Sequence, residues 1–313
     1  MTQVVNSVIV PVYGNRDTLG ALVARLSTLF GQLDAPSEAV FVIDGSPDDS
    51  RDVLVQVLAE SNIDWTVVDH SRNFGSFAAI RTGLQEARGQ YFAVVAADLQ
   101  EPPELLEDFF IALSSDVADI AVGKRVSRDD SKLSTASSNL FWSLYKSLVS
   151  PEIPKGGVDV FACNDVVRQE LLKLNESNSS LIGQLYWVGF RRIEVPYSRV
   201  ARTSGKSGWS FKKKINYLLD SIFSFTDLPL VVLTWTGVVG GVLTILAAIV
   251  VFTAYARGMI SEAGYTPLML VVLFSTFAIL SGLGIVGAYV WRVFENTKSR
   301  PLTIVSKRSS STD

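Results

Sequence analysis

The chain of 313 residues contains one cysteine and one histidine, so it is poor in side chains that form disulfides or bind structural metals. The single cysteine, Cys163, excludes an internal disulfide framework and a cysteine-based zinc site. Because it stands in an apolar run, we expect a buried structural thiol. The single histidine, His70, excludes a multi-histidine metal site, and its place after a strand-like run predicts a structural role at a loop edge.

Several common sequence signals are also absent. The formal net charge of -3 argues against a nucleic-acid-binding protein, which normally carries a basic face. Residues 1–6 lack both the basic and the apolar region of a signal peptide, so we expect no cleavable signal. No Gly-x-Gly-x-x-Gly follows the first strand-like run, and Gly205-Lys206-Ser207 lacks the earlier glycine of a phosphate-binding loop. Neither a dinucleotide site nor a P-loop is therefore expected.

Two long apolar stretches, 229–256 and 266–292, dominate the second part of the chain. Each exceeds the roughly 20 residues that cross a hydrocarbon core of about 30 Å as a helix. The connection between them is short, so the sequence predicts a transmembrane hairpin whose two ends lie on one side of the bilayer. A buried core hairpin is the alternative, which the length of the stretches and their scarcity of charge disfavour.

Basic residues flank the hairpin on the side of its two ends: Lys212, Lys213, Lys214, Arg292, Lys298, Arg300, Lys307 and Arg308. The loop inside the hairpin offers only Arg257 and an opposing Glu262. The positive-inside rule therefore predicts that the first part of the chain lies in the cytoplasm. The whole chain is then expected to be a multi-pass protein of the plasma (inner) membrane. Residues 211–228 combine lysines with apolar positions, which predicts an amphipathic segment at the interface. Glycines in both spans permit close packing within the hairpin or in a homo-oligomer.

The first part of the chain alternates strand-like and helix-like segments. Strands are expected at 4–12, 39–43, 65–69 and 91–97, and helices at 17–30, 49–61 and 76–87. This alternation predicts an α/β fold with a mostly parallel sheet and a crevice at the carboxyl ends of the strands. Asp44, Arg72, Asn73 and Asp98 all follow strands, so we expect a site there. An aspartate at a strand end suits a divalent cation that carries a diphosphate.

An ordered set of short motifs extends over nearly the whole chain: residues 8–13, Asp44-Gly45-Ser46, 72–75, 98–104, Gly123-Lys124-Arg125, 202–207, and 287–301. With these motifs the chain resembles the family 2 glycosyltransferases of GT-A fold. More narrowly, it looks like the branch that contains dolichyl-phosphate mannose synthase and the bactoprenol glucosyltransferases. The resemblance implies a GT-A domain over 1–210, the segment 211–228, the hairpin and a cytoplasmic tail over 293–313. We expect residues 309–313 of that tail to be disordered.

The resemblance also implies roles for individual residues. Pro11, Tyr13 and Asp44 would lie at the nucleoside of a nucleoside-diphosphate sugar, with Arg72 and Asn73 in the same substrate site. Further residues would act on the diphosphate, the acceptor and a Mg²⁺ or Mn²⁺ ion. Asp98 and Gln100 would bind the metal. Arg202 and Lys206 would contact phosphate, and Arg125 and Arg128 would contact the lipid phosphate or the leaving diphosphate. Asp159 would lie near the acceptor.

The chain departs from the family pattern at several positions. Ala96 replaces an expected aspartate, which removes one metal carboxylate. Glu101, Gln100, water or the diphosphate itself could complete the metal shell. Ser207-Gly208-Trp209 replaces the usual Ser-Lys-aromatic motif, so that the basic contact falls to Lys206 or Lys212.

The activity implied is inverting transfer of a hexosyl group from a nucleoside-diphosphate sugar to a polyprenyl phosphate, undecaprenyl or dolichyl. Such an acceptor is already anionic, so a strong general base is not required. Two alternatives stay open. A transferase acting on a hydroxyl of a lipid-linked saccharide or glycolipid would need Asp159 as base, and a non-catalytic scaffold would turn over no donor.

Overall fold

The protein is described by a computed structural model over residues 3–127, 143, 146–147, 152–154, 158–176, 179–200, 211–258 and 264–311. The chain divides into two compact units. The first combines Met1–Leu218 with Arg300–Asp313, and the second is Leu219–Ser299. The first unit extends to Leu218, beyond the predicted end at residue 210. Tyr217 packs against Phe77 within this unit, with ring centroids 5.5 Å apart.

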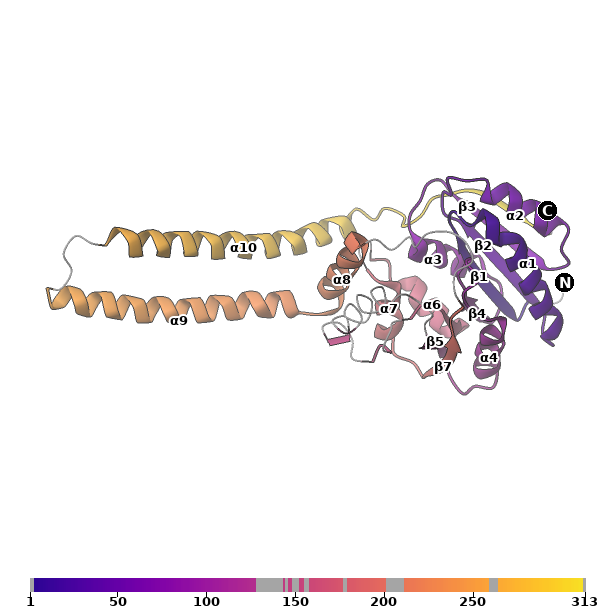
Figure 1. Cartoon of the computed structure of the whole chain (residues 1–313), viewed down its shortest axis with the longest axis horizontal. Coiled ribbons are helices and arrows are strands. Elements are labelled where there is room, and N and C mark those ends of the chain that lie inside the picture. The colour runs from indigo at the N-terminus through magenta and orange to yellow at the C-terminus, as the bar shows by residue number, and fades with distance from the viewer. Residues whose placement is uncertain are drawn as a thin grey trace. The chain divides into compact units, whose positions relative to one another are not determined.

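The first unit is built around an eight-stranded sheet of order β7-β5-β6-β4-β1-β2-β3-β8 (Figure 1). Strands β1, β2, β3 and β4 run parallel to one another, and β5 runs parallel to β7. Strands β6 and β8 are antiparallel to the strands beside them. The predicted mostly parallel α/β sheet is therefore confirmed. The strands are β1 Asn6–Val12, β2 Ser37–Ile43, β3 Asp64–His70, β4 Tyr91–Val94, β5 Ile120–Ser127, β6 Phe161–Asn164, β7 Arg192–Ser198 and β8 Val305–Ser310.

Apolar side chains are buried on both faces of the sheet. Along β1, Val8 and Val10 belong to the core on one face and Ile9 to the core on the other, and all three are fully buried. A continuous apolar run is typical of a parallel strand covered on both sides. Burial also raises the pKa of the Cys163 thiol to about 12, so the expected buried structural cysteine is confirmed. The helices of this unit are α1 Arg16–Gln32, α2 Ser50–Ala59, α3 Ser76–Glu86, α4 Pro103–Ser114, α6 Asp165–Lys173 and α7 Leu181–Trp187.

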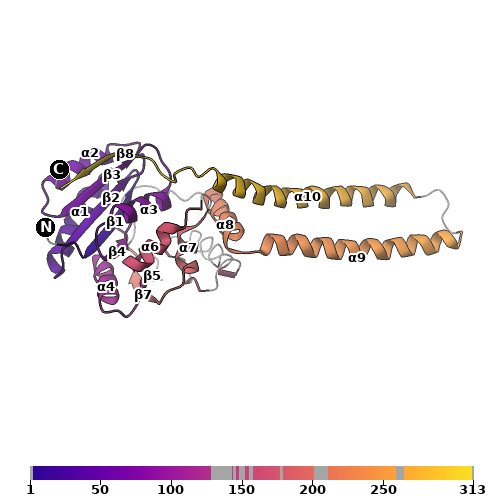
Figure 2. The ribbon, with the colours of Figure 1, turned by 180° about the vertical axis from the view of Figure 1, so that it is seen from behind.

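The prediction that residues 309–313 are disordered is wrong for residues 309–311, and the predicted tail, 293–313, contains the end of a helix and a strand. Helix α10 continues to Thr297, and residues 305–310 form β8, which pairs antiparallel with β3 (Figure 2). Residues 309–311 are ordered in this pairing, since the Ser311 N–H donates to Trp65 O at 3.0 Å and the Trp65 N–H donates to Ser311 Oγ at 3.3 Å. The physical reason is the open edge of β3, whose unpaired backbone groups are satisfied by a returning strand. Val305 also packs onto the buried side chains of Val42, Val68 and Ala79.

The second unit contains two long helices, α9 Leu228–Ala256 and α10 Tyr265–Thr297, which match the two predicted apolar stretches. Each is long and apolar enough to cross a membrane, by length and composition. Their apolar windows are not buried inside the protein, which argues against a core hairpin. The preceding helix α8, Phe211–Phe225, enters this unit with Asp220 and Ser224, which both accept hydrogen bonds from Arg292 on α10.

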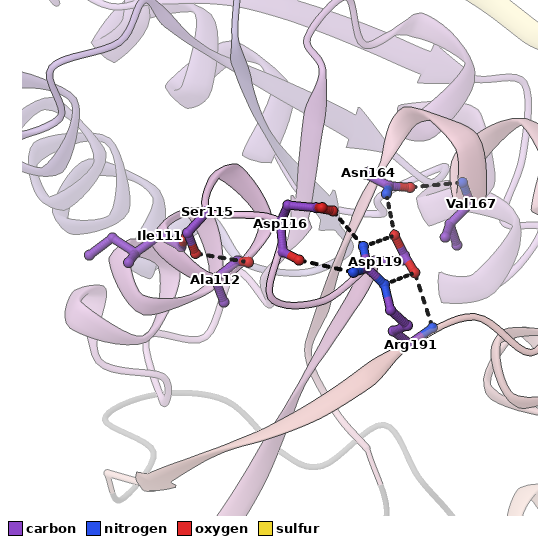
Figure 3. Close-up of polar contacts among 8 residues, drawn as sticks. All are labelled: Ile111, Ala112, Ser115, Asp116, Asp119, Asn164, Val167 and Arg191. Atoms are coloured by element: carbon purple, nitrogen blue, oxygen red, sulfur yellow. Dashed lines mark hydrogen bonds and ion pairs between the residues drawn. The ribbon is translucent and has the colours of Figure 1, made fainter.

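A closed network of polar side chains joins the amino ends of β5 and β7 to the end of β6 (Figure 3). Arg191 donates to both carboxylate oxygens of Asp119 at 3.0 and 3.1 Å and to Asp116. The backbone N–H of Arg191 and the Asn164 amide also donate to Asp119. This cluster lies at the edge of the sheet opposite to the predicted site, because it precedes β5 and β7.

Candidate functional site at the carboxyl edge of the sheet

The loops that follow β1, β2 and β3 form one hydrogen-bonded surface. Gly14 N–H donates to Ser46 Oγ at 2.8 Å, which joins the first loop to the second. Gly45 has a φ of +58°, and a Cβ there would lie 2.4 Å from the backbone of Arg72 and Asn73. The third loop therefore lies directly on the glycine of the second, at a distance that no side chain permits.

Asp44 fixes the third loop from inside the protein. Its carboxylate accepts hydrogen bonds from the backbone N–H groups of Phe74 and Gly75, each at 2.8 Å, and from His70 Nδ1 at 2.8 Å. Burial opposes the charged form, but these hydrogen bonds outweigh it and lower the pKa of Asp44. Asp44 is 2% exposed. The structure thus places this predicted nucleoside residue beneath the loop, where it holds Phe74 and Gly75 in position.

Other residues predicted at the nucleoside face outward. Tyr13 is 51% exposed, and Arg72 and Asn73 are exposed on the third loop. The guanidinium of Arg72 lies 3.9 Å from the centroid of the Phe74 ring. Pro11 is half-buried at the end of β1. These side chains offer aromatic and cationic surface to a planar, anionic ligand.

The loop after β4 carries the predicted metal ligands. Thr18 on α1 donates to Ala97 O at 2.6 Å, and Leu99 takes a φ of 61°, so the backbone turns sharply after Asp98. Gln100 is fixed at both ends of its amide: Nε2 donates to Val200 O at 3.1 Å and Oε1 accepts from Arg199 at 2.6 Å. Its amide oxygen retains a second lone pair for a ligand.

Glu101 is the most strongly perturbed carboxyl group in the described part of the chain. It is 5% exposed, and neither carboxylate oxygen has a hydrogen-bond partner among the described residues. Burial raises its pKa to about 8, and the neighbouring charges of Asp98 and Asp159 add to the increase. An unpartnered buried carboxyl group of this kind needs a functional explanation. The sequence suggested Glu101 only as a substitute within a metal shell.

A second group of charges lies at the ends of β5 and β7. Arg125 contacts Asp159 through two nitrogens at 3.1 and 3.2 Å, and Arg199 approaches the same carboxylate at 3.8 Å. The side chain of Arg125 is 7% exposed and that of Asp159 is 29% exposed. Tyr197 is buried beside them, its hydroxyl has no hydrogen-bond partner among the described residues, and burial raises its pKa.

Sequence reasoning missed Arg199 and Tyr197. The available signal was their position at and just after the end of the strand-like run 192–198, the place where Asp98 was recognised. The structure brings Asp98, Gln100, Arg125 and Asp159 to one side of the carboxyl edge. Three predicted residues, Arg128, Arg202 and Lys206, lie outside the described residues.

The residues after β4 are compatible with a divalent cation. Within the described ranges, no three His, Cys, Asp or Glu side chains form a group that could hold a metal. Asp98 and Glu101 supply two carboxylates and Gln100 an amide oxygen, and the buried oxygens of Glu101 need a partner. Oxygen donors of this kind suit Mg²⁺ or Mn²⁺ with further ligands from water and phosphate.

Comparison with known proteins identifies relatives over nearly the full chain. The family model described as Glycosyl transferase family 2 matches residues 7–174. An uncharacterized glycosyltransferase of Synechocystis is 31% identical and covers 96% of this chain and 94% of its own length. A prophage-derived bactoprenol glucosyl transferase of Shigella flexneri is 28% identical, with 96% and 97% covered. A mannosyltransferase from Pyrobaculum calidifontis, solved with GDP-Man and Mn²⁺, is 16% identical with a TM-score of 0.47, covering 89% of this chain and 86% of that one.

Proposed function

The chain belongs to glycosyl transferase family 2, and on that basis we propose an inverting hexosyltransferase that acts on a polyprenyl phosphate. The donor is a nucleoside-diphosphate sugar. One observation carries the proposal: oxygen donors at Asp98, Gln100 and Glu101 lie on the same edge of the sheet as Arg125 of β5 and Arg199 directly after β7. The cation of a bound diphosphate needs oxygen donors, and its phosphate oxygens need hydrogen-bond donors such as arginine. The bactoprenol glucosyl transferase among the relatives supports the lipid acceptor.

The residues on the β1–β3 side would bind the donor nucleoside. Tyr13, Arg72 and Asn73 present the exposed surface, and Asp44 holds the third loop in place. Asp98, with Gln100 and Glu101, would hold a divalent cation, which when bound neutralises charge on the diphosphate. With the nucleoside on the β1–β3 side and the reacting phosphates on the β5–β7 side, the sugar would lie between these two sides of the sheet edge.

The residues on the β5–β7 side would bind the phosphates that react. A phosphate oxygen of the acceptor attacks the anomeric carbon from the face opposite the diphosphate, forming one C–O bond as the other breaks. Arg125 and Arg199 stabilise the negative charge of the acceptor and the leaving group, because a guanidinium donates several hydrogen bonds to phosphate oxygens. We also assign Arg128, Arg202 and Lys206 to these phosphates. No proton has to be removed from an acceptor that is already ionised, and Asp159 orients Arg125 through its two contacts.

The second unit supplies the membrane location of the enzyme. We assign α9 and α10 as a transmembrane hairpin and α8 as an interfacial helix, with the catalytic domain in the cytoplasm. A lipid-phosphate acceptor lies in the same membrane. Gly282 on α10 lies close to Leu233 on α9. A Cβ added at Gly282 would lie 3.2 Å from Leu233 Cδ1, which fits close packing of the two spans.

The test is turnover of UDP-glucose, UDP-GlcNAc and GDP-mannose by the purified full chain with undecaprenyl phosphate, in Mg²⁺, Mn²⁺ or EDTA. We expect a lipid-linked sugar from one donor that is lost in EDTA and in Asp98→Ala. Asp116→Ala is the matched control, since this aspartate has an 86% exposed side chain at the opposite edge of the sheet. Turnover that survives EDTA would refute the metal assignment, and no turnover with any donor would refute the activity.

Asp159 distinguishes a phosphate acceptor from a hydroxyl acceptor. Both of its oxygens already contact Arg125, which favours an orienting role over that of a general base. Asp159→Asn is therefore expected to retain measurable turnover with undecaprenyl phosphate. Complete loss of this turnover with intact donor binding would show that Asp159 is essential. A wild-type chain that glycosylates a lipid-linked saccharide but not undecaprenyl phosphate, and loses that activity in Asp159→Asn, would favour a hydroxyl acceptor.

A further inference from the structure

The strand that follows the apolar hairpin is hydrogen-bonded to the loop of the candidate donor site. Ser71 N–H donates to Ile304 O at 2.9 Å, directly before Arg72. Ser306 Oγ donates to Asp69 O at 3.0 Å, and Val305 is paired with His70 after an irregularity in the register. The chain that leaves α10 thus returns to the loop after β3, and these contacts lie within the first unit.

A continuous line of side-chain hydrogen bonds runs from this segment to Asp44. Thr303 Oγ1 lies 3.0 Å from Thr82 Oγ1, Thr82 Oγ1 lies 2.9 Å from His70 Nε2, and His70 Nδ1 lies 2.8 Å from Asp44. Asp44 in turn accepts from the N–H groups of the 71–75 loop. Thr82 and His70 are 1% and 4% exposed, so bulk water cannot replace a lost partner easily.

The roles of the two ring nitrogens exclude His70 as a base acting on substrate. Asp44 is held ionised by its hydrogen bonds, so His70 Nδ1 carries the proton of their contact. Nε2 is occupied by Thr82. The imidazole is therefore a buried connector, and its orientation depends on the hydroxyl groups of Thr82 and Thr303.

We propose that Thr303 is a positioning residue for the donor nucleotide, acting through Thr82, His70 and Asp44 on the loop that carries Arg72 and Asn73. The segment after the hairpin is then part of the donor site as well as a cover for the edge of β3. This inference rests on the proposed function, because it takes the 71–75 loop as a nucleotide-binding loop.

Thr303→Val tests the proposal by removing one hydroxyl while keeping the size of the side chain and the Ser71–Ile304 backbone bond. In the full chain with undecaprenyl phosphate, we expect the donor KM and the Kd of the matching nucleoside diphosphate (UDP or GDP) to rise about three- to tenfold. The KM for undecaprenyl phosphate should stay close to the wild-type value, and the Tm should fall by a few degrees at most, since one buried hydrogen bond is lost. Thr303→Ser, which restores the hydroxyl, should restore donor binding.

Ser311→Ala is the matched control on the same segment. Ser311 Oγ contacts Asp64 at 2.6 Å at the other end of the β3–β8 pairing, away from the donor loop. An equal increase in donor KM in Ser311→Ala would refute the proposal, since general docking of β8 would then explain the effect. The Thr82→Val/Thr303→Val double variant should bind donor no more weakly than Thr82→Val alone, because both changes break one chain.

The outcomes separate this inference from the proposed function. If the wild-type chain neither binds UDP or GDP nor turns over a donor, the proposed function fails. If the wild-type chain binds a nucleotide and Thr303→Val binds it equally well, only the role of Thr303 fails.

Discussion

Strands β5, β6 and β7 carry arginine–carboxylate clusters at both of their ends, and the two clusters differ in how completely their polar atoms are paired. At one end, Asp119 accepts four hydrogen bonds, three from Arg191 and one from Asn164 (Figure 3). At the other end, the buried oxygens of Glu101 and the hydroxyl of Tyr197 have no partner within the described ranges. The same strands therefore present one closed cluster and one open cluster.

Under the proposed function, the difference separates a cluster that stabilises the fold from a cluster that would bind a ligand. A network whose members satisfy one another gains less free energy from binding a phosphate or a cation. A buried carboxyl group beside cations is costly until a ligand completes it, so it persists where function requires it. The open cluster also lies on the edge where the predicted donor residues gather. Variants of the two clusters should therefore affect different measurements.

The largest expected effect follows from Arg125→Ala. The Arg125 side chain is 7% exposed. In the proposed mechanism it binds a reacting phosphate, so its removal should lower kcat/KM for lipid-linked sugar formation about 100-fold or more. Arg125→Lys should recover only part of this loss, because lysine lacks the planar fork. The matched control, Arg191→Ala, should keep kcat/KM within about twofold. Full turnover in Arg125→Ala would show that the open cluster does not meet the reacting phosphates.

The next effect concerns Glu101 and the pH dependence of stability, measured as Tm of the full chain in EDTA. The folded protein holds the proton up to about pH 8, whereas an ordinary glutamate releases it near 4.5. Folding therefore binds a proton between these values, and wild-type stability falls as the pH rises through that window.

Glu101→Gln cannot ionise and should lack this slope. Near pH 8 its Tm should exceed that of the wild type by a few degrees, and the difference should vanish near pH 4.5. Parallel pH profiles for the two proteins would show that Glu101 is ionised in the fold and already has a partner. Asp116→Asn, in the closed cluster, is the control for the loss of a carboxylate in general.

The first four strands were predictable because their signal is local. Runs such as residues 6–12 and 37–43 are apolar and β-branched, and their alternation with helical spacing indicated a mostly parallel sheet. The strand order and the strands β5, β6 and β7 were not predicted. Strand β8 was not predictable in this way. Its sequence, VSKRSS, is polar and typical of a tail, and it becomes a strand only because the edge of β3 is available.

The same distinction applies to the candidate site. Asp98 and Arg72 were recognised because each stands in a short motif after a strand. Arg199 and Tyr197 were missed because their importance depends on burial and on partners from distant parts of the chain, Gln100 and Asp159. The position of Asp44 was predicted, but its burial beneath the 71–75 loop depends on His70 and on two backbone N–H groups.

The smallest expected effects belong to the closed cluster, where Arg191→Ala and Asp119→Asn should lower Tm without changing kcat/KM. Asp119→Asn should lower the Tm more than Arg191→Ala does. The Asp119 side chain is 17% exposed and also accepts hydrogen bonds from the Arg191 backbone and from Asn164, whereas the Arg191 side chain is 54% exposed. Hydrogen bonds from Arg191 lower the pKa of Asp119, so its stabilisation is complete at neutral pH and is lost as acid protonates it. A marked loss of turnover in Arg191→Ala would overturn the comparison. It would mean that β7 transmits changes from one end to the other, and that pairing of polar atoms does not separate structural clusters from functional ones.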